Sequence, residues 1–424
     1  MFSTFARFCA NRHLLPGTLC FPLALATLPL LAAEYGHDHL DTSASLTFQE
    51  IFASALENTP EYLEAAVREG QAGDYAAAGS RWIAGQPSLQ LNYYDDSTLD
   101  NVGLKEMEYG VQLPLWRPGQ RSASRNLGQQ YEAQVDAWKT DLAWVVAGRL
   151  RSMLADIARA ELGMQLQERA VTDAQRLVNV TQTLFDAGEV ARLELMQAQS
   201  LLAERQADLL EADAEMIDAE RAYFIYTGLG LRPAATHTEA QSPREEIGSD
   251  HPRLLYLRSS VDLALANVRQ SENAAKGNPT LTIGSRRERG DQYQNYISSV
   301  GIQLSIPFGG GSYVSAQTSS ARRARVDAEV EYQNALRRLN QGLHEVEHDL
   351  FILDQEEPLR RTQADLSRQR FDMALTAFEA GETTLAQAVI AQQEALESER
   401  ALQTLLLQRE KLITEYNQLI GILP

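Results

Sequence analysis

Apolar residues in this 424-residue chain alternate with polar ones in four short stretches, which is the pattern of β-strands with one apolar face. Two stretches lie in each half of the chain, and a polar turn joins the members of each pair. The alternating residues are Leu89, Leu91 and Tyr93; Tyr109, Val111 and Leu113; Leu281 and Ile283; and Val300, Ile302, Leu304 and Ile306. The pattern predicts two β-hairpins with long polar loops and half-buried strands.

Helices are predicted on both sides of the first hairpin. Thr47 and Glu50 have the spacing of a capping box, in which each side chain bonds the other residue's backbone amide at a helix start. This helix is expected to resume after Pro60 and to end near Ala78. A proline-free stretch after the hairpin predicts a single helix over residues 122–187, about 100 Å long at 1.5 Å per residue.

Apolar and small residues recur every seven residues in the helix after residue 187 and in its counterpart near the C-terminus. These positions are Leu195, Leu202, Leu209, Met216 and Tyr223, and Ala391, Ser398, Leu405, Leu412 and Leu419. Such seams are typical of helices that pack along their length. The second long helix contains Pro358, where we expect an interruption and a kink. Each half of the chain is therefore predicted to run as helix, two strands, long helix, turn and helix.

The two halves also match residue by residue. Pro60 and Pro252 start corresponding stretches 192 positions apart, and residues 185–229 align without a gap to residues 378–422. The shared residues include Phe185/Phe378, Ala187/Ala380, Gly188/Gly381, Glu189/Glu382, Tyr223/Tyr416 and Gly228/Gly421. Full-length duplication is common in tubes and walls and uncommon in catalytic domains. We predict a first repeat over residues 34–230, a linker over 231–250 and a second repeat over 251–424.

The first 33 residues have the features of a secretory signal peptide. Arg7 and Arg12 give a basic start, an apolar stretch follows, and small residues precede a cleavage point after Ala33. Both cysteines, Cys9 and Cys20, lie in this leader, so the mature chain is expected to form no disulfide. The residues before Cys20 make a poor lipoprotein cleavage site, and the sequence leaves lipidation of the N-terminus open.

The chain is acidic, with a net charge of −19. Loss of Arg7 and Arg12 with the leader would make it −21. Nucleic acid is not an expected partner, because its binding requires lysine and arginine to neutralise phosphates. After the leader the sequence has no apolar run of about 18 residues that predicts a membrane-spanning helix.

Four strands are too few to close a barrel, and an open sheet has edges that lipid does not tolerate. If several identical chains contributed their strands to one tube, the barrel would have enough strands to close and no sheet edge would be left unpaired. At this point the sequence resembles the TolC-like outer-membrane efflux channels over nearly the whole mature chain. The motifs are Leu46-Thr47-Phe48-Gln49-Glu50-Ile51 with Ala55-Leu56-Glu57-Asn58, Leu113-Pro114-Leu115, Ile306-Pro307-Phe308-Gly309-Gly310-Gly311, and two Phe-x-Ala-Gly-Glu turns followed by Ala-Gln.

The resemblance implies a mainly α-helical fold with a β-barrel part, assembled as a homotrimer. Four strands per chain would form one barrel in the outer membrane, and the long antiparallel helices would form a periplasmic α-barrel. Such channels perform no chemistry, and neither catalytic residues nor a cofactor or resident metal is expected. Their partners are outer-membrane lipid, a periplasmic adaptor protein and an inner-membrane pump, here expected to be of the resistance–nodulation–division type.

The turns at residues 185–189 and 378–382 are the candidate adaptor-docking tips. Gly188 and Gly381 suit the left-handed residue that ends many helices. The resemblance implies that the adaptor's helical hairpins dock at these two turns. The alternative is that the turns have only a structural role. The residues assigned to docking are Ala187, Gly188, Glu189, Ala380, Gly381 and Glu382.

Acidic residues near the tips are candidates for the channel entrance. In the best-known members of the family, acidic residues after the second turn form a constricting ring, and here those positions are Gln387 and Ile390. Glu189, Glu194 and Glu382 are the alternative acidic residues, each of which threefold symmetry would repeat. Ordinary solvated glutamates are the competing interpretation.

Two histidine clusters raise other chemistry. His344-Glu345-Val346-Glu347-His348 satisfies the zinc-hydrolase spacing, but it lies on a predicted wall helix without an evident third ligand. His37-Asp38-His39 could bind a soft metal ion or form a disordered polar chain end. These clusters and the compact length favour export of heavy-metal cations. A drug or protein-secretion channel, an exported coiled-coil scaffold and a zinc hydrolase are the alternatives.

Overall fold

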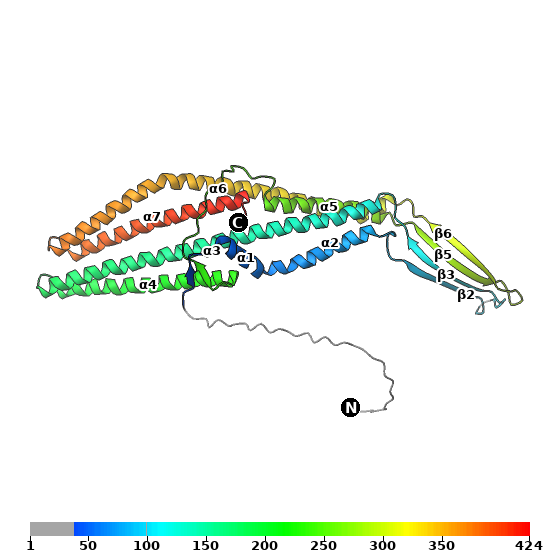
Figure 1. Ribbon diagram of the computed structural model, residues 1–424, viewed down its shortest axis with the longest axis horizontal. Helices are drawn as coiled ribbons and strands as arrows, with labels where there is room; N and C mark the ends of the chain where they lie inside the picture. The colour runs from blue at the N-terminus through cyan, green and yellow to red at the C-terminus, as the bar shows by residue number, and fades with distance from the viewer. Residues whose placement is uncertain (1–37, 99) are drawn as a thin grey trace, which may run out of the picture. The chain divides into compact units, whose positions relative to one another are not determined.

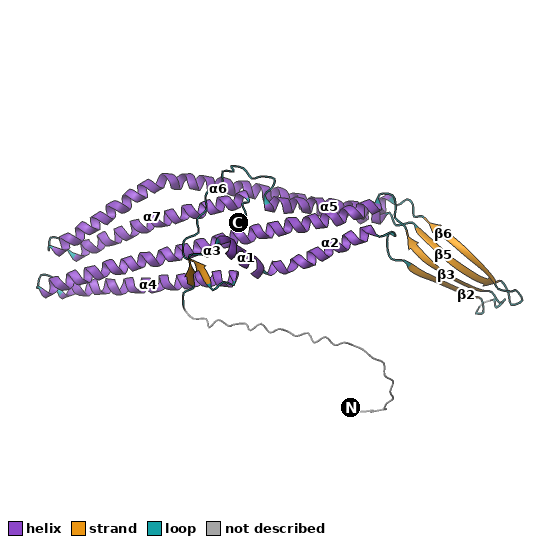
Figure 2. Cartoon of the chain, in the orientation of Figure 1, coloured by secondary structure: helices purple, strands orange, loops and turns teal. Residues whose placement is uncertain are grey.

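The computed structural model describes residues 38–98 and 100–424, and residues 39–424 form one compact unit. The predicted signal peptide (1–33) and His37 lie outside the described residues. The elements, shown in Figures 1 and 2, are β1 (Asp41–Ser43), α1 (Phe48–Asn58), a 3₁₀ helix (Pro60–Leu63), α2 (Glu64–Ser80), β2 (Ser88–Asp95), β3 (Lys105–Pro114), α3 (Gln120–Asp186), α4 (Arg192–Thr227), β4 (Leu231–Pro233), α5 (Pro252–Ala275), β5 (Thr280–Arg289), β6 (Ile297–Ser305), α6 (Gly311–Glu379) and α7 (Leu385–Ile420).

The predicted order of elements is present in both halves. In the first half α1 and α2, β2, β3, α3 and α4 follow one another, and in the second half α5, β5, β6, α6 and α7 do so. The capping box of α1 is formed: the Thr47 hydroxyl accepts a bond from the Glu50 amide, and the Glu50 carboxylate accepts one from the Thr47 amide. The chain then breaks at Pro60 before it resumes as α2, as the sequence predicts.

Each long helix packs against a shorter one in a hairpin. α3, with 67 residues, packs against α4, with 36, and α6, with 69 residues, packs against α7, with 36. α3 also contacts α7, which joins the two hairpins side by side. The interior consists of several apolar clusters strung along these seams instead of one central core. The heptad positions Met216, Tyr223, Leu405 and Leu412 are buried, as the sevenfold spacing predicts.

The expected interruption at Pro358 is wrong. α6 runs from Gly311 to Glu379 without a break, and Figure 1 shows its ribbon arching instead of stopping. Proline removes one backbone hydrogen bond and crowds the preceding turn, but packing against a neighbour can hold the flanking turns in helical geometry. Here α7 supplies that support, since Arg409 of α7 bonds Asp354 of α6 at 2.9 Å.

β2, β3, β5 and β6 form an antiparallel sheet in that order, and its register places the apolar residues in common rows. One row joins Leu89, Val111, Ile283 and Ile302 across all four strands. The strands were predicted to be half-buried, but in the single chain this face is exposed, with Ile302 at 74%. No described helix packs against it, so the apolar face has no second layer within the chain.

The opposite face of the sheet is polar and hollowed. A depression of 290 Å³ is lined there by polar residues that include Gln90, Asn92, Glu108 and Arg286. Gly110, Gly284 and Gly301 lie opposite one another across three strands. A Cβ atom on Gly284 would come within 2.6 Å of the Tyr109 carbonyl oxygen, so the close approach of β3 and β5 requires glycine at this position, whereas a Cβ atom on Gly301 would meet no atom within 4 Å.

The predicted linker, residues 231–250, contains a strand that the sequence analysis did not identify. β4 pairs in parallel with β1, which matches Asp41 to Leu231 and Ser43 to Pro233. Three-residue strands have too few alternating positions to be recognised by periodicity, and this pair forms only because the fold brings the two segments together. Among the described helices, none is long and apolar enough to cross a membrane.

Candidate functional site at the helix turns

The two turns at the ends of the long helices have the same backbone geometry. In the first, the Gly188 amide donates to the Phe185 carbonyl oxygen and the Glu189 amide to that of Leu184. In the second, the Gly381 amide donates to Phe378 and the Glu382 amide to Ala377. This pair of bonds is the Schellman motif, which closes a helix through a left-handed residue.

Both glycines have positive φ, as predicted, at +77° for Gly188 and +72° for Gly381. A Cβ atom at either position would meet no other atom within 4 Å, so the backbone conformation is what requires glycine here. Ala187, Glu189, Ala380 and Glu382 beside them are exposed. The turns therefore present a short, exposed surface on a fixed backbone.

A shared apolar cluster holds the two turns in place. It draws residues from α3, α4, α6 and α7, and Phe371 and Phe378 at its centre are 0% and 1% exposed. Leu385, in the first turn of α7, and Leu184, at the end of α3, also belong to it. The turns are rigidly attached to the hairpins because the residues immediately behind them are buried together.

The residues proposed for the channel entrance lie close to the turns but differ in surroundings. Glu189 and Glu382 are exposed in the turns, and Glu194 is half-buried in the first turn of α4. Gln387 is in the first turn of α7, where its amide donates to the capping Thr384 and its side-chain oxygen accepts a bond from the Thr383 hydroxyl. A single chain cannot arrange these residues as a ring. An entrance ring in an assembly of several chains stays a prediction.

Ion pairs between the hairpins were missed by the sequence analysis. Arg368 of α6 bonds the buried carboxylate of Asp173 on α3 at 2.8 Å and 3.4 Å. Arg169 of α3 bonds Glu399 of α7 at 3.2 Å. The chain contains many charged residues on helices, and no sequence signal distinguishes the few that meet across the hairpins. The first pair is the stronger candidate for holding the hairpins together, since its carboxylate is buried.

Away from the turns, the linker is bound to the middle of the helices by a buried carboxylate. Glu239 accepts bonds from Arg151 on α3, Asn417 on α7 and His237. Burial acts to raise the pKa of Glu239, but these donors outweigh it and lower the pKa to about 2. The linker is therefore a packed part of the fold.

His39 is also held by carboxylates. Its ring nitrogens lie 3.1 Å from a Glu220 oxygen and 3.0 Å from an Asp213 oxygen, both on α4. Burial acts to lower the pKa of His39, and the two carboxylates together raise it above its ordinary value. Glu220 also accepts bonds from the Leu40 amide and from Arg232 at 2.6 Å. Both carboxylates hold the N-terminal segment against α4, so the interpretation of His39 as part of a disordered polar end is wrong.

The zinc-hydrolase spacing lies on the outside of α6. His344, Glu345 and His348 are exposed, while Val346 between them is buried in the seam with α7. Within the part of the chain that the structure describes, no three histidine, cysteine or acidic side chains come close enough to hold a metal ion.

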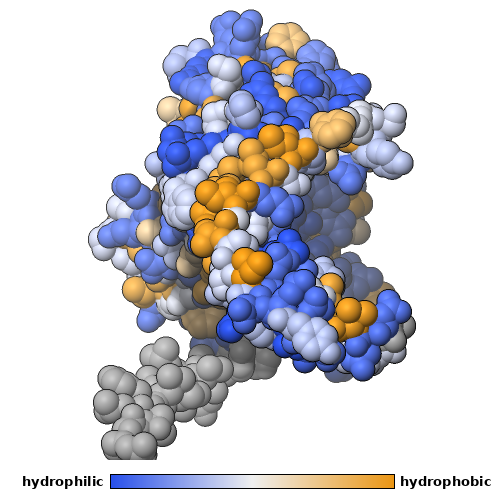
Figure 3. All heavy atoms as spheres, turned by 90° about the vertical axis from the view of Figure 1, so that its right-hand side faces the viewer, coloured by the Kyte–Doolittle hydropathy of each residue, from blue (hydrophilic) through white to orange (hydrophobic). Residues whose placement is uncertain are grey.

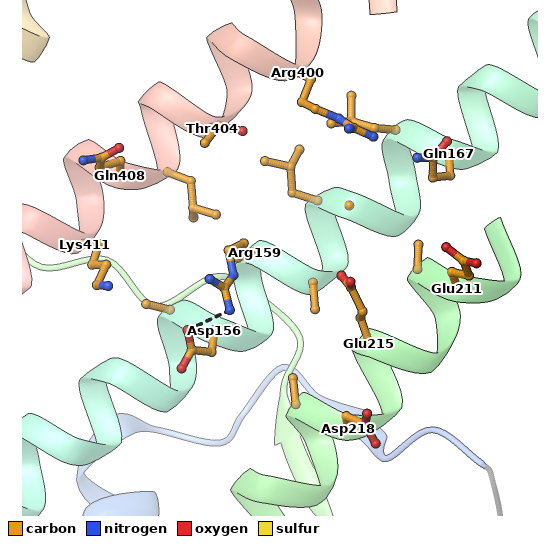
Figure 4. A pocket seen from close by; sticks show the side chains of 18 of the residues that line it. Asp156, Arg159, Gln167, Glu211, Glu215, Asp218, Arg400, Thr404, Gln408 and Lys411 are labelled. Atoms are coloured by element: carbon orange, nitrogen blue, oxygen red, sulfur yellow. Dashed lines mark ion pairs between the residues drawn. The ribbon is translucent and has the colours of Figure 1, made fainter. Parts of the chain in front are cut away.

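A groove of 1230 Å³ lies between α3, α4 and α7. Figure 4 shows side chains that line it. Its walls carry charges of both signs, with Asp156 and Arg159 of α3 bonded at 3.3 Å. Glu211, Glu215 and Asp218 line the α4 side, and Arg400 and Lys411 line the α7 side. This lining suits water or a charged protein surface better than an apolar ligand.

No family model matches the chain. Among curated proteins it is similar to Nodulation protein T of Rhizobium leguminosarum bv. trifolii, at 24% identity over 377 residues, which cover 82% of this chain and 76% of the relative. It is also similar to Outer membrane efflux protein BepC of Brucella suis biovar 1, at 26% identity over 181 residues, which cover 39% of this chain and 40% of the relative.

Among solved structures, the outer membrane protein VceC from Vibrio cholerae aligns with a TM-score of 0.71 at 15% identity. The alignment covers 88% of this chain and 95% of that one. Agreement over this length shows a common fold. The prediction of a TolC-like fold, mainly helical with antiparallel strands, is confirmed.

Proposed function

We propose that this chain is the outer-membrane channel of a tripartite efflux system. Three copies would share one barrel, and substrate would pass passively from a periplasmic adaptor and an inner-membrane pump to the exterior. The observation that carries the proposal is the four-stranded sheet, which is apolar on one face and polar and hollowed on the other. Its fold likeness to the outer membrane protein VceC and its sequence similarity to Outer membrane efflux protein BepC support the same proposal.

The free edges of the sheet explain why several copies are needed. Within the described chain, β2 and β6 each pair on one side only, so each has a row of unpaired backbone amides and carbonyls. Lipid cannot satisfy these groups. Pairing β2 of one copy with β6 of the next would satisfy them and close a barrel. Its apolar rows would then face lipid and its polar rows the lumen, as in known outer-membrane barrels.

The turns would form the opposite, periplasmic end. They are exposed, rigidly supported and present twice per chain, so a trimer would offer six equivalent surfaces to an adaptor. Glu189, Glu194 and Glu382, each repeated three times, would add negative charge around the entrance and attract cations.

A matched pair of substitutions tests the barrel. Ile302→Arg would put a charge on the lipid side of β6, at a cost of about 2–4 kcal/mol per chain near the bilayer midplane. Gln303→Arg would put the same charge on the polar side. We expect the first to abolish stable insertion into outer membranes and the second to leave detergent-extracted trimers, measured by light scattering with correction for the micelle. A stable, water-soluble monomer without detergent would refute the proposal.

For the exported substrate we propose heavy-metal cations, which the histidine clusters and the compact length favour. In the structure His39 bonds Asp213 and Glu220, and His344 and His348 lie exposed on α6, so the histidines give this proposal little support and it rests on the compact length and the acidic entrance. Drugs and secreted proteins are the alternatives. Deleting the gene and scoring sensitivity to a panel of metal salts and drugs separates them, because sensitivity to drugs without sensitivity to metals would exclude the metal proposal.

A further inference from the structure

Basic side chains occupy one end of the apolar face of the sheet. The register places Met107 opposite Arg287 and Lys105 opposite Arg289. Alternate residues of a strand share a face, so these side chains lie on the same face as Tyr109, Val111 and Ile283. From the row of Tyr109 to the row of Lys105 is four residues, or about 13 Å along the strand. Basic side chains therefore begin where the apolar rows end, next to the hairpin loops. Figure 3, viewed from that end, shows apolar residues (orange) gathered in a diagonal band between polar surfaces.

Both arginines are held in place without a carboxylate. The guanidinium carbons of Arg287 and Arg289 lie 4.6 Å and 5.2 Å from the centre of the Tyr296 ring. The Nε of Arg289 also donates to the Gly103 carbonyl oxygen at 3.1 Å. Stacking on an aromatic ring orients a guanidinium while most of its N–H donors stay available.

The neighbouring arginine, which lies on the other face of the sheet, is paired with carboxylates. Arg286 points to the polar side, where it bonds Glu106 at 2.7 Å and also pairs with Glu108 and Glu288. Among the described residues neither Arg287 nor Arg289 forms an ion pair. On the same face the Asp95 carboxylate forms an ion pair with the Lys105 ammonium group at 3.3 Å.

Carboxylates of the adjacent loops are used to hold backbone. Asp96 accepts bonds from the amides of Val102 and Gly103, and Asp291 from those of Tyr293 and Gln294. Within the described part of the chain Arg287 and Arg289 therefore remain without a carboxylate partner, although the net charge of the chain is −19. Two guanidinium groups without a carboxylate partner, at the end of the apolar rows, can attract an anionic group there.

We propose that Arg287 and Arg289, assisted by Lys105, bind phosphate groups of lipid headgroups in the outer leaflet of the outer membrane. The inference rests on the proposed function, in which the apolar rows lie in lipid and the hairpin loops lie outside. A guanidinium donates two parallel bonds to a phosphate, and the end of the apolar rows is the depth at which headgroups begin. Tyr296 positions the two guanidinium groups, and the ammonium group of Lys105, which Asp95 also contacts, lies in the neighbouring strand.

Binding of lipid A to the purified trimer in detergent tests this proposal. The probes are bisphosphoryl lipid A and its dephosphorylated form, and bound lipid is counted by native mass spectrometry. We expect wild type to bind the phosphorylated form at least about tenfold more tightly, and Arg287→Gln with Arg289→Gln to remove that preference. The matched control is Arg322→Gln with Arg323→Gln on α6, which removes the same charge outside the sheet and should leave binding unchanged.

Equal binding of the two lipids by wild type, or unchanged preference in the sheet variant, would overturn the inference. Competition by millimolar inorganic phosphate would also overturn it, because the site would then be a general anion site. Should the double variant fail to form trimers, Arg289→Gln alone supplies the comparison, and an unchanged preference in it counts against the proposal. Absence of trimers in wild type would instead refute the proposed function.

Discussion

Removing Arg368 should loosen the two helical hairpins near the turns. Its partner Asp173 has a side chain that is 6% exposed, so Arg368→Met would leave a buried carboxylate without its cation. Loss of one partner of a fully buried pair costs about 3–5 kcal/mol. Arg368 itself is 47% exposed, and water can reach the carboxylate from that side, so we expect about 1–2 kcal/mol.

Hydrogen–deuterium exchange of the purified trimer measures this local effect. A loss of about 1–2 kcal/mol would raise exchange rates in peptides around residues 166–186 and 365–379 by about 5- to 30-fold. Peptides around Glu239, in the middle of the helices, should not change. Arg409→Met is the control, because it removes a more exposed pair with Asp354 within one hairpin and should have a smaller effect.

A second variant separates the ion pair from the shape of the side chain. Asp173→Leu with Arg368→Met removes both charges and should restore much of the protection, since replacing a whole buried pair by apolar groups is often neutral or stabilising. Our reasoning fails if the single variant exchanges like wild type, or if the double variant opens as much as the single one.

Three further predictions concern residues outside this pair. Gly188→Val with Gly381→Val should yield inserted trimers that dock the adaptor poorly and leave cells sensitive to the exported compound. The reason is that a β-branched residue at positive φ costs roughly 1 kcal/mol or more at each turn. Normal resistance would show that the turns do not dock the adaptor. His344→Ala with His348→Ala should leave assembly and efflux intact, and loss of a stoichiometric zinc together with a peptidase activity would contradict this. Because the pKa of His39 is raised, its bonds to the two carboxylates stabilise residues 39–43 fully when the pH is below about 6.5, the ordinary histidine pKa. This stabilisation is lost as the pH rises through the raised pKa. Proteolysis at these residues should therefore increase with pH, and His39→Gln should abolish the pH dependence.

The sequence by itself determined the local elements, because their signals are local. The capping box at Thr47 and Glu50 predicted where α1 begins, and the repeated glycines predicted both turns. Strict alternation predicted all four strands of the sheet, and the proline-free stretch predicted α3 nearly to its ends. Each of these features depends on residues a few positions apart, so periodicity and backbone preference suffice to find them.

Tertiary structure decided which distant residues meet. The pairing of β1 with β4, the continuity of α6 through Pro358 and the bond between Asp173 and Arg368 all depend on segments that the fold brings together. A helix surface with many charges allows many ion pairs, and the sequence does not select among them. The same limit applies to the sheet: alternation gave it an apolar face, but only the register showed that the apolar rows coincide across four strands and end at Arg287 and Arg289.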